Sequence, residues 1–323
     1  MASVEDGSAR RRAALSITLA APLAILGLAS FLGSWWGPLD LLSHFRPQWA
    51  AASLAAVLVA VHAASRAGAV LSLFLLAAHA LPLAPYLAGI GSARSVSHSE
   101  VRVMTLNLRN RHTSADSFRA LIEAEDPDVV LLTELPHDET PLLQALGDRY
   151  PQRTASRRGS PFDVVLLSRW TLETWSVDRS VTPFLPVLTA RLCDPSSSTR
   201  CLTVVGLHAA RPFGSGAWQK AQLSLVVDAV KAVPTGRVVV LGDLNLTPWS
   251  ATFHRFVREG GLSDNPPERG LVATWLSRFP LFGLALDHVL AGPGVEIVQS
   301  RVGRDVGSDH FPVTAHLALR PHP

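Results

Sequence analysis

The sequence predicts an apolar membrane region followed by one large α/β domain, and two observations support this prediction. Between Ala13 and Ala93 the only charged side chains are Asp40, Arg46 and Arg66, whereas charged residues occur at ordinary density further along the chain. After this change in composition, strand-like and helix-like segments alternate, which is typical of an α/β domain. With 323 residues, the chain is long enough to hold both parts.

Three apolar stretches fill the first region, at about residues 13–36, 48–65 and 67–90. A helix needs about 20 residues to cross the roughly 30 Å hydrocarbon core of a bilayer, so each stretch is predicted to be a transmembrane helix. A cleaved signal peptide is the alternative for the first stretch, but its apolar run is too long and two more stretches follow. The predicted organisation is a membrane region at 1–94 and a second domain at 95–323.

The placement of charges and cysteines predicts on which side of the membrane the second domain lies. Arg10–Arg12 precede the first stretch, and the positive-inside rule assigns them to the cytoplasm, so three spans put residues 95–323 outside it. Cys193 and Cys201 flank a short loop between strand-like runs; they either form a disulfide, which persists only in an oxidising compartment, or remain two separate thiols. The predicted location is the inner or plasma membrane of the cell, as a multi-pass protein with an extracytoplasmic domain.

The elements of the second domain are predicted from hydrophobic periodicity and turn residues. Strands are expected at residues 101–108, 129–133, 163–168, 187–192, 202–207, 238–241, 287–291 and 313–319. Helices are expected at residues 114–125, 215–233 and 250–259, the last one stopped by Gly260 and Gly261. This mixture of elements indicates a single α/β domain.

Polar side chains stand at the ends of several of these predicted strands. Such residues suit the interior of a strand poorly, and a buried carboxylate is costly unless a cation or hydrogen bonds compensate for its burial. In layered α/β domains, the edge where strands end is where functional sites assemble. The candidate residues are Asn107, Glu134, His208, Asp243, Asn245, Asp287, Asp309 and His310.

Each candidate also has a purely structural interpretation. Glu134 can form a salt bridge with Arg109 or Arg169, the Gly-Asp-x-Asn string can be an ordinary turn, and a lone histidine such as His208 is often structural. The concentration of these residues at strand ends favours a functional site instead. Carboxylates, carboxamides and imidazoles without a usable cysteine suit a hard divalent metal and phosphoryl transfer better than they suit zinc.

The polar motifs occur in a characteristic order along residues 101–319. They are Thr105-x-Asn107, Glu134, Ser168-Arg169, His208, Gly242-Asp243-x-Asn245, Asp287-His288 and Ser308-Asp309-His310. In this order they resemble the motifs of the endonuclease/exonuclease/phosphatase superfamily, which contains deoxyribonuclease I-like nucleases and several phosphatases. The apolar start, with residues 40–48 between the first two stretches, resembles a bacterial membrane-anchored branch of that superfamily.

The resemblance implies a fold and a set of metal ligands. The expected fold is a four-layer α/β sandwich, in which two central mixed sheets are flanked by helices and share the edge that carries the site. The expected cofactor is Mg²⁺ or Mn²⁺, held by Glu134 with help from Asn107 and Asp309. Arg169 is a further candidate, for contact with the substrate.

The resemblance also implies catalytic roles. Asp243 would orient or deprotonate the attacking water, while Asn245 would hold a phosphoryl oxygen. His310, oriented by Asp287, and His208 would stabilise the charge that develops during the reaction. All five residues stand where the motifs require them.

The sequence therefore predicts a membrane-anchored, metal-dependent hydrolase of phosphodiesters or phosphomonoesters. Its partners would be the lipid bilayer and a phosphate-ester substrate, which could be a lipid headgroup, a nucleic acid or a small molecule; no obligate protein partner is inferred. A DNA or RNA endonuclease or exonuclease is the alternative, but residues 95–323 hold 23 basic and 23 acidic residues, without the basic surplus usual in duplex-binding domains. A second alternative, a non-catalytic binding module, would be expected to have lost a key residue, and none is missing.

Overall fold

The computed structural model describes residues 14, 18, 21–22, 24–87, 101–109, 113–136, 140–154, 162–213, 216–264 and 271–320. The chain forms two compact units. The N-terminal unit comprises Met1–Ala88 together with Trp249–Thr252, and the α/β unit comprises Gly89–Pro248 and Phe253–Pro323. The predicted boundary after residue 94 lies outside the described residues.

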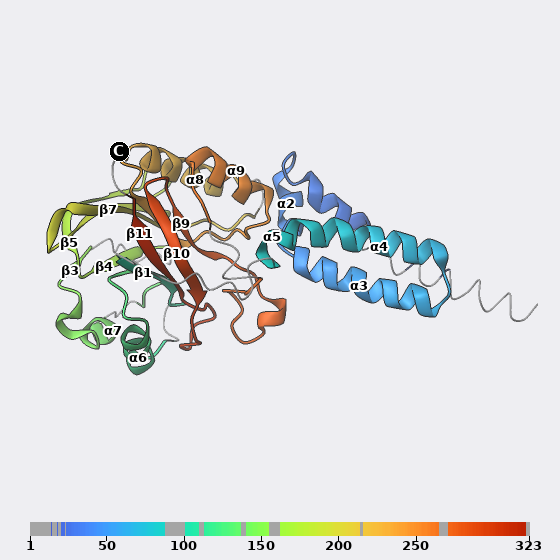
Figure 1. The fold of residues 1–323 in the computed structure, drawn as a ribbon, viewed down its shortest axis with the longest axis horizontal. Helices are drawn as coiled ribbons and strands as arrows, with labels where there is room; N and C mark the ends of the chain where they lie inside the picture. Colours follow the sequence, from blue (N-terminus) through green and yellow to red (C-terminus); the bar gives the residue numbers. More distant parts are fainter. Residues whose placement is uncertain are drawn as a thin grey trace, which may run out of the picture. The chain divides into compact units, whose positions relative to one another are not determined.

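The α/β unit contains two mixed β-sheets (Figure 1). The six-stranded sheet has the order β10 (Val295–Val302), β11 (Val313–Leu319), β1 (Val101–Asn107), β2 (Val129–Thr133), β4 (Val164–Ser168) and β3 (Gln152–Arg153). The five-stranded sheet has the order β5 (Thr171–Asp178), β6 (Val187–Asp194), β7 (Ser197–His208), β8 (Val238–Asp243) and β9 (Asp287–Ala291). The helical elements are α6 (Ala115–Glu125), α7 (Thr140–Gln144), η3 (Gly147–Arg149), α8 (Ala217–Lys231), α9 (Ala251–Gly260) and the short 3₁₀ turn η4 (Pro280–Phe282).

The two sheets pack face to face because alternate residues of each strand point to opposite sides. One set of buried aliphatic residues fills the space between the sheets, including Val103, Leu131, Leu166, Leu188, Val204 and Val239. Their neighbours point outward, where Phe118 of α6 packs on the first sheet and Val226 of α8 packs on the second. The predicted arrangement, two mixed sheets flanked by helices, is confirmed.

The predicted strands and helices of this unit are all present, with ends shifted by a few residues. Ser114 caps α6 as its sequence suggests, because its hydroxyl accepts a hydrogen bond from the N–H of Ser117 at 3.1 Å. The structure adds β3, β5, β10 and α7 to the predicted elements. Strand β5 lies at the edge of its sheet and is largely exposed, so it lacks the apolar run that marks a buried strand.

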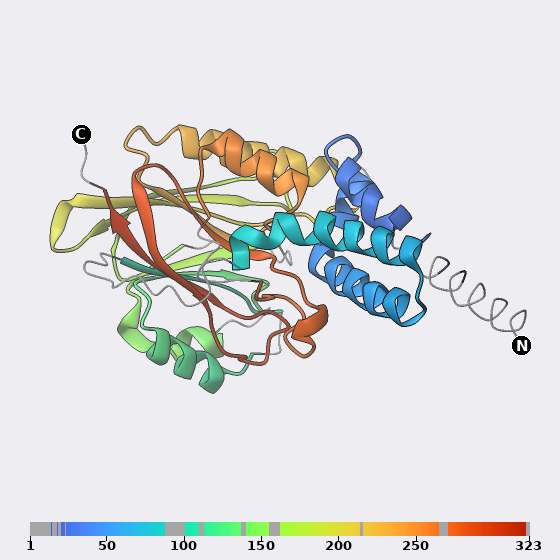
Figure 2. The same ribbon diagram turned by 45° about the vertical axis from the view of Figure 1, so that its right-hand side comes forward.

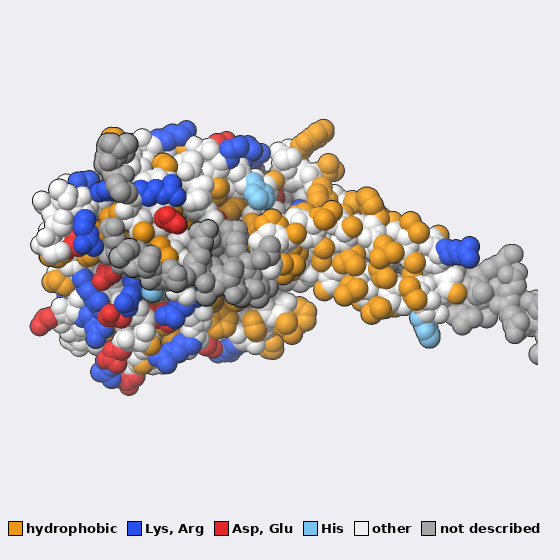
Figure 3. Space-filling model, in the orientation of Figure 1, with side chains coloured by type: hydrophobic (Ala, Val, Ile, Leu, Met, Phe, Trp, Pro, Cys, Tyr) orange, Lys and Arg blue, Asp and Glu red, His pale blue; other side chains and the backbone are white. Residues whose placement is uncertain are grey.

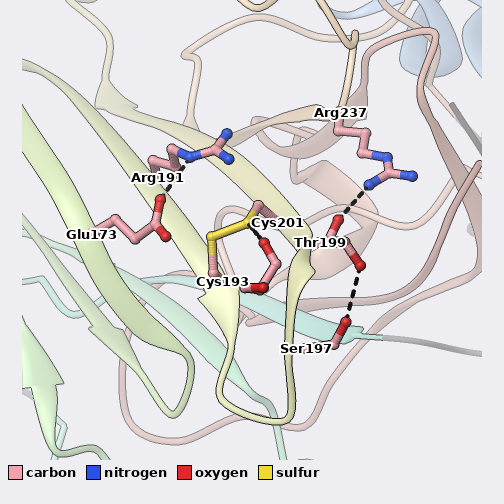
Figure 4. Close-up of a disulfide and its surroundings, with 8 residues drawn as sticks. Glu173, Arg191, Cys193, Ser197, Thr199, Cys201 and Arg237 are labelled. Atoms are coloured by element: carbon pink, nitrogen blue, oxygen red, sulfur yellow. Dashed lines mark hydrogen bonds and ion pairs between the residues drawn. A yellow bond between two sulfur atoms is a disulfide. The ribbon is translucent and has the colours of Figure 1, made fainter.

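Cys193 and Cys201 form a disulfide across the hairpin of β6 and β7 (Figure 4). The two residues face each other directly in the register of the strands. On the neighbouring strand pair, Arg191 donates a hydrogen bond to Glu173 at 2.8 Å. Because β7 begins at this hairpin and ends at His208, the disulfide lies at the opposite end of the sheet from that histidine.

The N-terminal unit is helical. It contains η1 (Ser30–Leu32), α2 (Gly37–Ser43), α3 (Arg46–His62), α4 (Arg66–Ala80), η2 (Leu81–Leu83) and α5 (Ala84–Leu87). Helices α3 and α4 lie side by side in both ribbon views (Figures 1 and 2). Within this unit, the buried carboxylate of Asp40 accepts hydrogen bonds from the N–H groups of Ala251 and Thr252, at 2.8 and 2.9 Å. Burial alone would raise the pKa of Asp40, but hydrogen bonds from the side chain of Thr252, from these two N–H groups and from Ser43 outweigh it and lower that pKa.

One helical stretch among the described residues, Arg66–Leu87, is long and apolar enough to cross a membrane. It coincides with the third predicted span, at residues 67–90. Helix α3 corresponds to the second, but its 17 residues extend only about 25 Å, which is shorter than a typical hydrocarbon core. The first predicted span, at 13–36, falls partly outside the described residues. The described residues therefore contain one candidate membrane span, and the three transmembrane helices predicted from the sequence are not supported.

Candidate active site

The strand directions bring the predicted polar residues to one edge of the α/β unit. Strands β1 and β2 run parallel, as do β7 and β8, so their carboxyl ends lie together. Strand β9 is antiparallel to β8, and its first residue, Asp287, pairs with Asp243. His208 pairs with Asp243 on the other side. The ends of both sheets therefore contribute side chains to the same place.

Asn107 connects the two sheets at this edge. Its side-chain Nδ2 donates hydrogen bonds to Glu134 Oε1 at 3.0 Å and to Asp243 Oδ2 at 3.2 Å. Its Oδ1 accepts a bond from the N–H of Arg109, and its carbonyl accepts one from the Ser308 hydroxyl at 2.6 Å. Every polar group of this fully buried side chain is thus satisfied, which explains how an asparagine is tolerated in a core strand.

Asp243 is the centre of the cluster. Its Oδ2 lies 3.4 Å from Nε2 of His208 and 3.8 Å from Nε2 of His310. Burial raises the pKa of Asp243 to about 7, and the negative charge of Asp287 adds to the rise, while the charge of His310 and the hydrogen bonds from Asn245 and Asn107 oppose it. Near neutral pH, the protonated and ionised forms of this carboxyl group are consequently both populated.

His310 and Asp287 form a buried, hydrogen-bonded pair, with His310 Nδ1 2.8 Å from Asp287 Oδ2. Burial would lower the pKa of His310, but the charge and the hydrogen bond of Asp287 outweigh it and raise that pKa to about 9. Conversely, burial would raise the pKa of Asp287, and the charge of His310 leaves it lowered. The pair is therefore an imidazolium and a carboxylate, with Nε2 of the ring facing Asp243.

The Gly-Asp-x-Asn turn has a backbone that only these residue types accommodate easily. Gly242 has φ +142°, and a Cβ atom there would lie 1.9 Å from the carbonyl oxygen of Leu207. Asn245 has φ +51°, in the left-handed region that asparagine tolerates better than most residues. Its N–H donates to Asp243 Oδ1 at 2.9 Å, and its Nδ2 donates to the carbonyl of Ala209 at 2.8 Å. One of its two amide hydrogens is thus already used.

His208 is held on two sides. Its Nε2 lies 3.8 Å from Glu134 Oε1 as well as near Asp243, and its ring centroid lies 4.6 Å from that of Phe162, with the two rings tilted by 41°. Glu134 itself follows β2 directly and adopts φ +51°. A non-glycine residue in this conformation is strained, and such strain tends to gather at functional sites.

The donor atoms fit a hard divalent cation. Glu134, Asp243 and Asp287 bring three carboxylates to a largely buried edge, and polar side-chain atoms of Asp243, Asp287 and His310 lie within 4.8 Å of one another. The charge of His310 balances one carboxylate, and the raised pKa of Asp243 reflects burial and excess negative charge that a cation would relieve. Oxygen-rich ligand sets of this kind suit Mg²⁺ or Mn²⁺.

Two predicted site residues take other positions. The carboxylate of Asp309 faces Arg109, with Oδ2 3.3 Å from Nη1, and lies outside the group of Asp243, Asp287 and His310. Within the described residues, Asp309 is thus an ion-pair partner at the end of β1 rather than a member of that group.

Arg169 is not brought to this edge at all. Strand β4 is antiparallel to β2, so Ser168 pairs with Val129 at the start of β2, at the far end from Glu134. Arg169 instead donates a hydrogen bond to Asp126 at 2.6 Å. The predicted substrate contact by Arg169 does not fit this position and is corrected accordingly.

Two further residues at the site were not among the predicted site residues. Thr274 Oγ1 accepts hydrogen bonds from the N–H groups of Leu286 and Asp287, both at 2.9 Å, and so fixes the start of β9. Phe162 packs on His208. Thr274 lies in a loop without any pattern, whereas Phe162 could have been noticed as an aromatic residue directly before a strand.

A sequence model of the Endonuclease/Exonuclease/phosphatase family matches residues 104–310 of the chain, the segment that contains every polar residue of the site described above. The chain belongs to this family. It is thus a metal-dependent hydrolase that acts on phosphate esters. No curated protein sequence matches the chain.

Several solved structures share the fold of this chain. The endonuclease/exonuclease/phosphatase of Beutenbergia cavernae DSM 12333 aligns with a TM-score of 0.58 at 21% identity, covering 70% of this chain and 73% of that one. The protein of the same description from Bacteroides vulgatus aligns with a TM-score of 0.58 at 16% identity, covering 68% and 99%. A Staphylococcus aureus beta toxin variant with bound magnesium ions aligns with a TM-score of 0.53 at 15% identity, covering 68% and 99%.

Proposed function

We propose that this protein is a membrane-anchored phosphoesterase that uses Mg²⁺ or Mn²⁺ to hydrolyse phosphodiester or phosphomonoester bonds. The observation that carries the proposal is the convergence of Asn107, His208 and His310 on one carboxylate oxygen of Asp243. Bound magnesium in the related beta toxin structure supports the choice of metal. The metal would be held by Glu134, with Asn107 beside it, and would supply positive charge to the phosphoryl oxygens.

The side chains of the site have distinct roles in this proposal. Asp243 orients the attacking water and accepts its proton, for which a pKa near neutrality is well suited. The water oxygen bonds to phosphorus, the P–O ester bond breaks, and the departing oxygen takes up a proton. His310, kept protonated by Asp287, and His208 stabilise the charge on the phosphoryl group. Asn245 keeps one amide hydrogen for a phosphoryl oxygen.

A reporter assay tests the catalytic part of the proposal. The full chain, purified in detergent, should hydrolyse bis-p-nitrophenyl phosphate or p-nitrophenyl phosphate with Mg²⁺ or Mn²⁺ and lose this activity in EDTA. Asp243→Ala should reduce the rate by at least about 10²-fold. Glu134→Gln should weaken metal binding, measured by calorimetry, by about tenfold or more. Asp228→Asn, an exposed change on α8, is the matched control and should change neither quantity.

The outcomes of this assay separate the possible substrates and the failure of the proposal. A wild-type chain that binds neither metal and cleaves neither reporter would overturn the proposal. Plasmid nicking that is lost in Asp243→Ala would identify a nuclease, whereas nicking retained in that variant would indicate contamination.

Three features support the membrane anchor and an extracytoplasmic active site. The stretch Arg66–Leu87 has the length and apolarity of a membrane span. Hydrophobic side chains cover the visible face of α3 and α4 (Figure 3), where Leu58, Val61 and Phe74 are exposed, and soluble proteins rarely expose so large an apolar patch. The disulfide of Cys193 favours an oxidising compartment. A C-terminal fusion to a reporter enzyme that is active only outside the cytoplasm tests the orientation and should be active. An inactive fusion, together with an active fusion to a reporter that works only in the cytoplasm, would reverse it.

A further inference from the structure

An exposed apolar tip projects from the loop that precedes β9. The tip comprises residues 279–282, Phe-Pro-Leu-Phe, which include the turn η4. Leu281 is 88% exposed, Phe282 67% and Phe279 63%. Scattered apolar residues are common on protein surfaces, but three large ones among four consecutive residues of an exposed turn mark an interaction site. Figure 3 shows hydrophobic side chains gathered where the ribbon of η4, orange in Figures 1 and 2, leaves the α/β unit.

The loop that carries the tip is fastened to the catalytic edge at both ends. On one side, Ser277 donates its N–H to the carbonyl of Asp309 at 3.0 Å and its hydroxyl to the carbonyl of Ser308 at 2.7 Å. On the other side, Thr274 accepts the N–H of Asp287. The residues that precede His310 and the residue that orients its ring are thus bonded to the base of the tip. Anything that the tip binds is consequently held beside the active site.

The tip is built to leave water at low cost. The N–H of Phe282 donates to the carbonyl of Phe279 at 2.9 Å, the N–H of Gly283 donates to Pro280 at 3.1 Å, and Pro280 itself has no N–H. Backbone groups that are bonded internally can enter a lipid layer, where no water is available to satisfy them. The preceding Arg278 is exposed, and no acidic residue occurs in the sequence between residues 271 and 286. A cation beside an apolar tip matches the phosphate layer above lipid chains.

A second pair of exposed aromatic residues follows another strand that ends at the site. Phe213 and Trp218 are 67% and 66% exposed, and they follow the end of β7 at His208. Together with Arg211 they line a pocket of about 140 Å³. Two segments that are joined to active-site strands, one after β7 and one before β9, therefore carry exposed apolar side chains together with an arginine.

We propose that the apolar tip inserts into the surface of a lipid bilayer, and that the substrate is a phosphate ester in a lipid headgroup. This inference rests on the proposed phosphoesterase function and names its substrate class. A bilayer is favoured over a second copy of the chain because the same chain carries Arg66–Leu87, a stretch with the properties of a membrane span, so lipid is within reach of a tethered domain. The neutral charge balance of residues 95–323 also disfavours a nucleic acid at this edge.

Insertion can be measured directly, because both native cysteines are used in the disulfide. Leu281→Cys therefore provides a unique thiol for an environment-sensitive fluorophore. In vesicles of phosphatidylcholine and phosphatidylglycerol that contain the full chain, brominated lipids should quench this fluorophore. Glu123→Cys is the matched control, since it is exposed near the end of α6, which runs back from the active-site edge to the start of β2, and it should not be quenched.

Activity is measured on two reporters that release the same p-nitrophenolate group. One is water-soluble bis-p-nitrophenyl phosphate, and the other is a p-nitrophenyl phosphodiester of diacylglycerol embedded in the vesicles. The triple variant Phe279→Ser, Leu281→Ser and Phe282→Ser should cleave the soluble reporter at the wild-type rate and the lipid reporter about tenfold more slowly or worse, because the apolar contacts with lipid are lost. Trp175→Ser, an exposed aromatic residue of the edge strand β5, should leave both rates unchanged.

The possible outcomes lead to different conclusions. Equal rates of wild type and triple variant on the lipid reporter, or an unquenched fluorophore at position 281, would overturn the inference. If the triple variant instead turned a dimer into a monomer in light scattering without slowing lipid cleavage, the tip would be a contact between copies and the inference would fall. No cleavage of the soluble reporter by the wild type would be a failure of the proposed function itself.

Discussion

The charge pair of Asp287 and His310 makes a quantitative prediction about pH. His310 has a pKa of about 9, raised from the usual 6.5 against the opposing effect of burial, chiefly by the charge and hydrogen bond of Asp287. A protonated His310 should assist phosphoryl transfer, so kcat/KM is expected to fall as the pH rises through about 9. In Asp287→Asn the carboxylate charge is absent, so burial becomes the dominant effect on the pKa of His310 and lowers it. The alkaline limb of the profile should therefore move down by about two pH units.

The same substitution should also affect stability. Because the folded-state pKa of His310 lies above its usual value, the pair contributes stability that is fully present below pH 6.5 and is lost as the pH rises through about 9. The rise in the pKa of His310 from 6.5 to about 9 corresponds to roughly 3 kcal/mol of stability in this buried pair. Asp287→Asn should thus lower the free energy of unfolding by about this amount at pH 6, and by much less at pH 10.

The assay is the pH dependence of kcat/KM on bis-p-nitrophenyl phosphate between about pH 5 and 10, together with urea unfolding at both ends of that range. At pH 8 the variant should be at least about 10²-fold slower than the wild type. Asp228→Asn removes an exposed carboxylate of α8 and serves as the control. An alkaline limb at the same pH in Asp287→Asn and wild type would refute the role assigned to the pair.

Two further predictions concern the scaffold of the site. Gly242→Ala should cost about 3 kcal/mol or more in urea unfolding and abolish hydrolysis, because its Cβ would clash with the carbonyl of Leu207. Gly261→Ala, with φ +59° and open space around it, should cost only about 1 kcal/mol, and equal costs would contradict the steric argument. Replacing Cys193 and Cys201 by serine should lower the unfolding free energy by at most about 2.5 kcal/mol, for a sequence separation of 8. Hydrolysis should persist, and its loss would show that the far hairpin shapes the site.

The parts of the fold that sequence reasoning predicted are those with a strong burial pattern. The run 129–133 is buried along its whole length, so it reads as a core strand, and the carboxylate that follows it stands out. The same contrast identified Asp243 at the end of β8 and His208 at the end of β7. Strand β5 was not predicted because it is exposed at the edge of its sheet. Its pairing with β6 does not require the apolar residues that mark a buried strand.

The side-chain positions that sequence order does not reveal are those that depend on strand direction and on contacts between loops. Ser168 and Arg169 end a strand just as Glu134 does, but whether two strand ends share an edge depends on strand direction, and β4 is antiparallel to β2. Asp309 is next to His310 in sequence, yet its side chain faces Arg109. Thr274 supports Asp287 from a loop, through bonds that only the three-dimensional arrangement reveals.

Inferring the substrate requires a different kind of information from inferring the reaction. A buried carboxylate or asparagine is unusual enough in a strand that its residue type alone points to a function. Phe279, Leu281 and Phe282 carry no such signal, because apolar residues in a sequence are expected to be buried. Only their exposure, on a loop that is bonded to Asp309 and Asp287 at its base, makes them informative. The class of reaction could therefore be inferred from the amino-acid sequence, whereas a statement about the surface on which the enzyme acts required the fold.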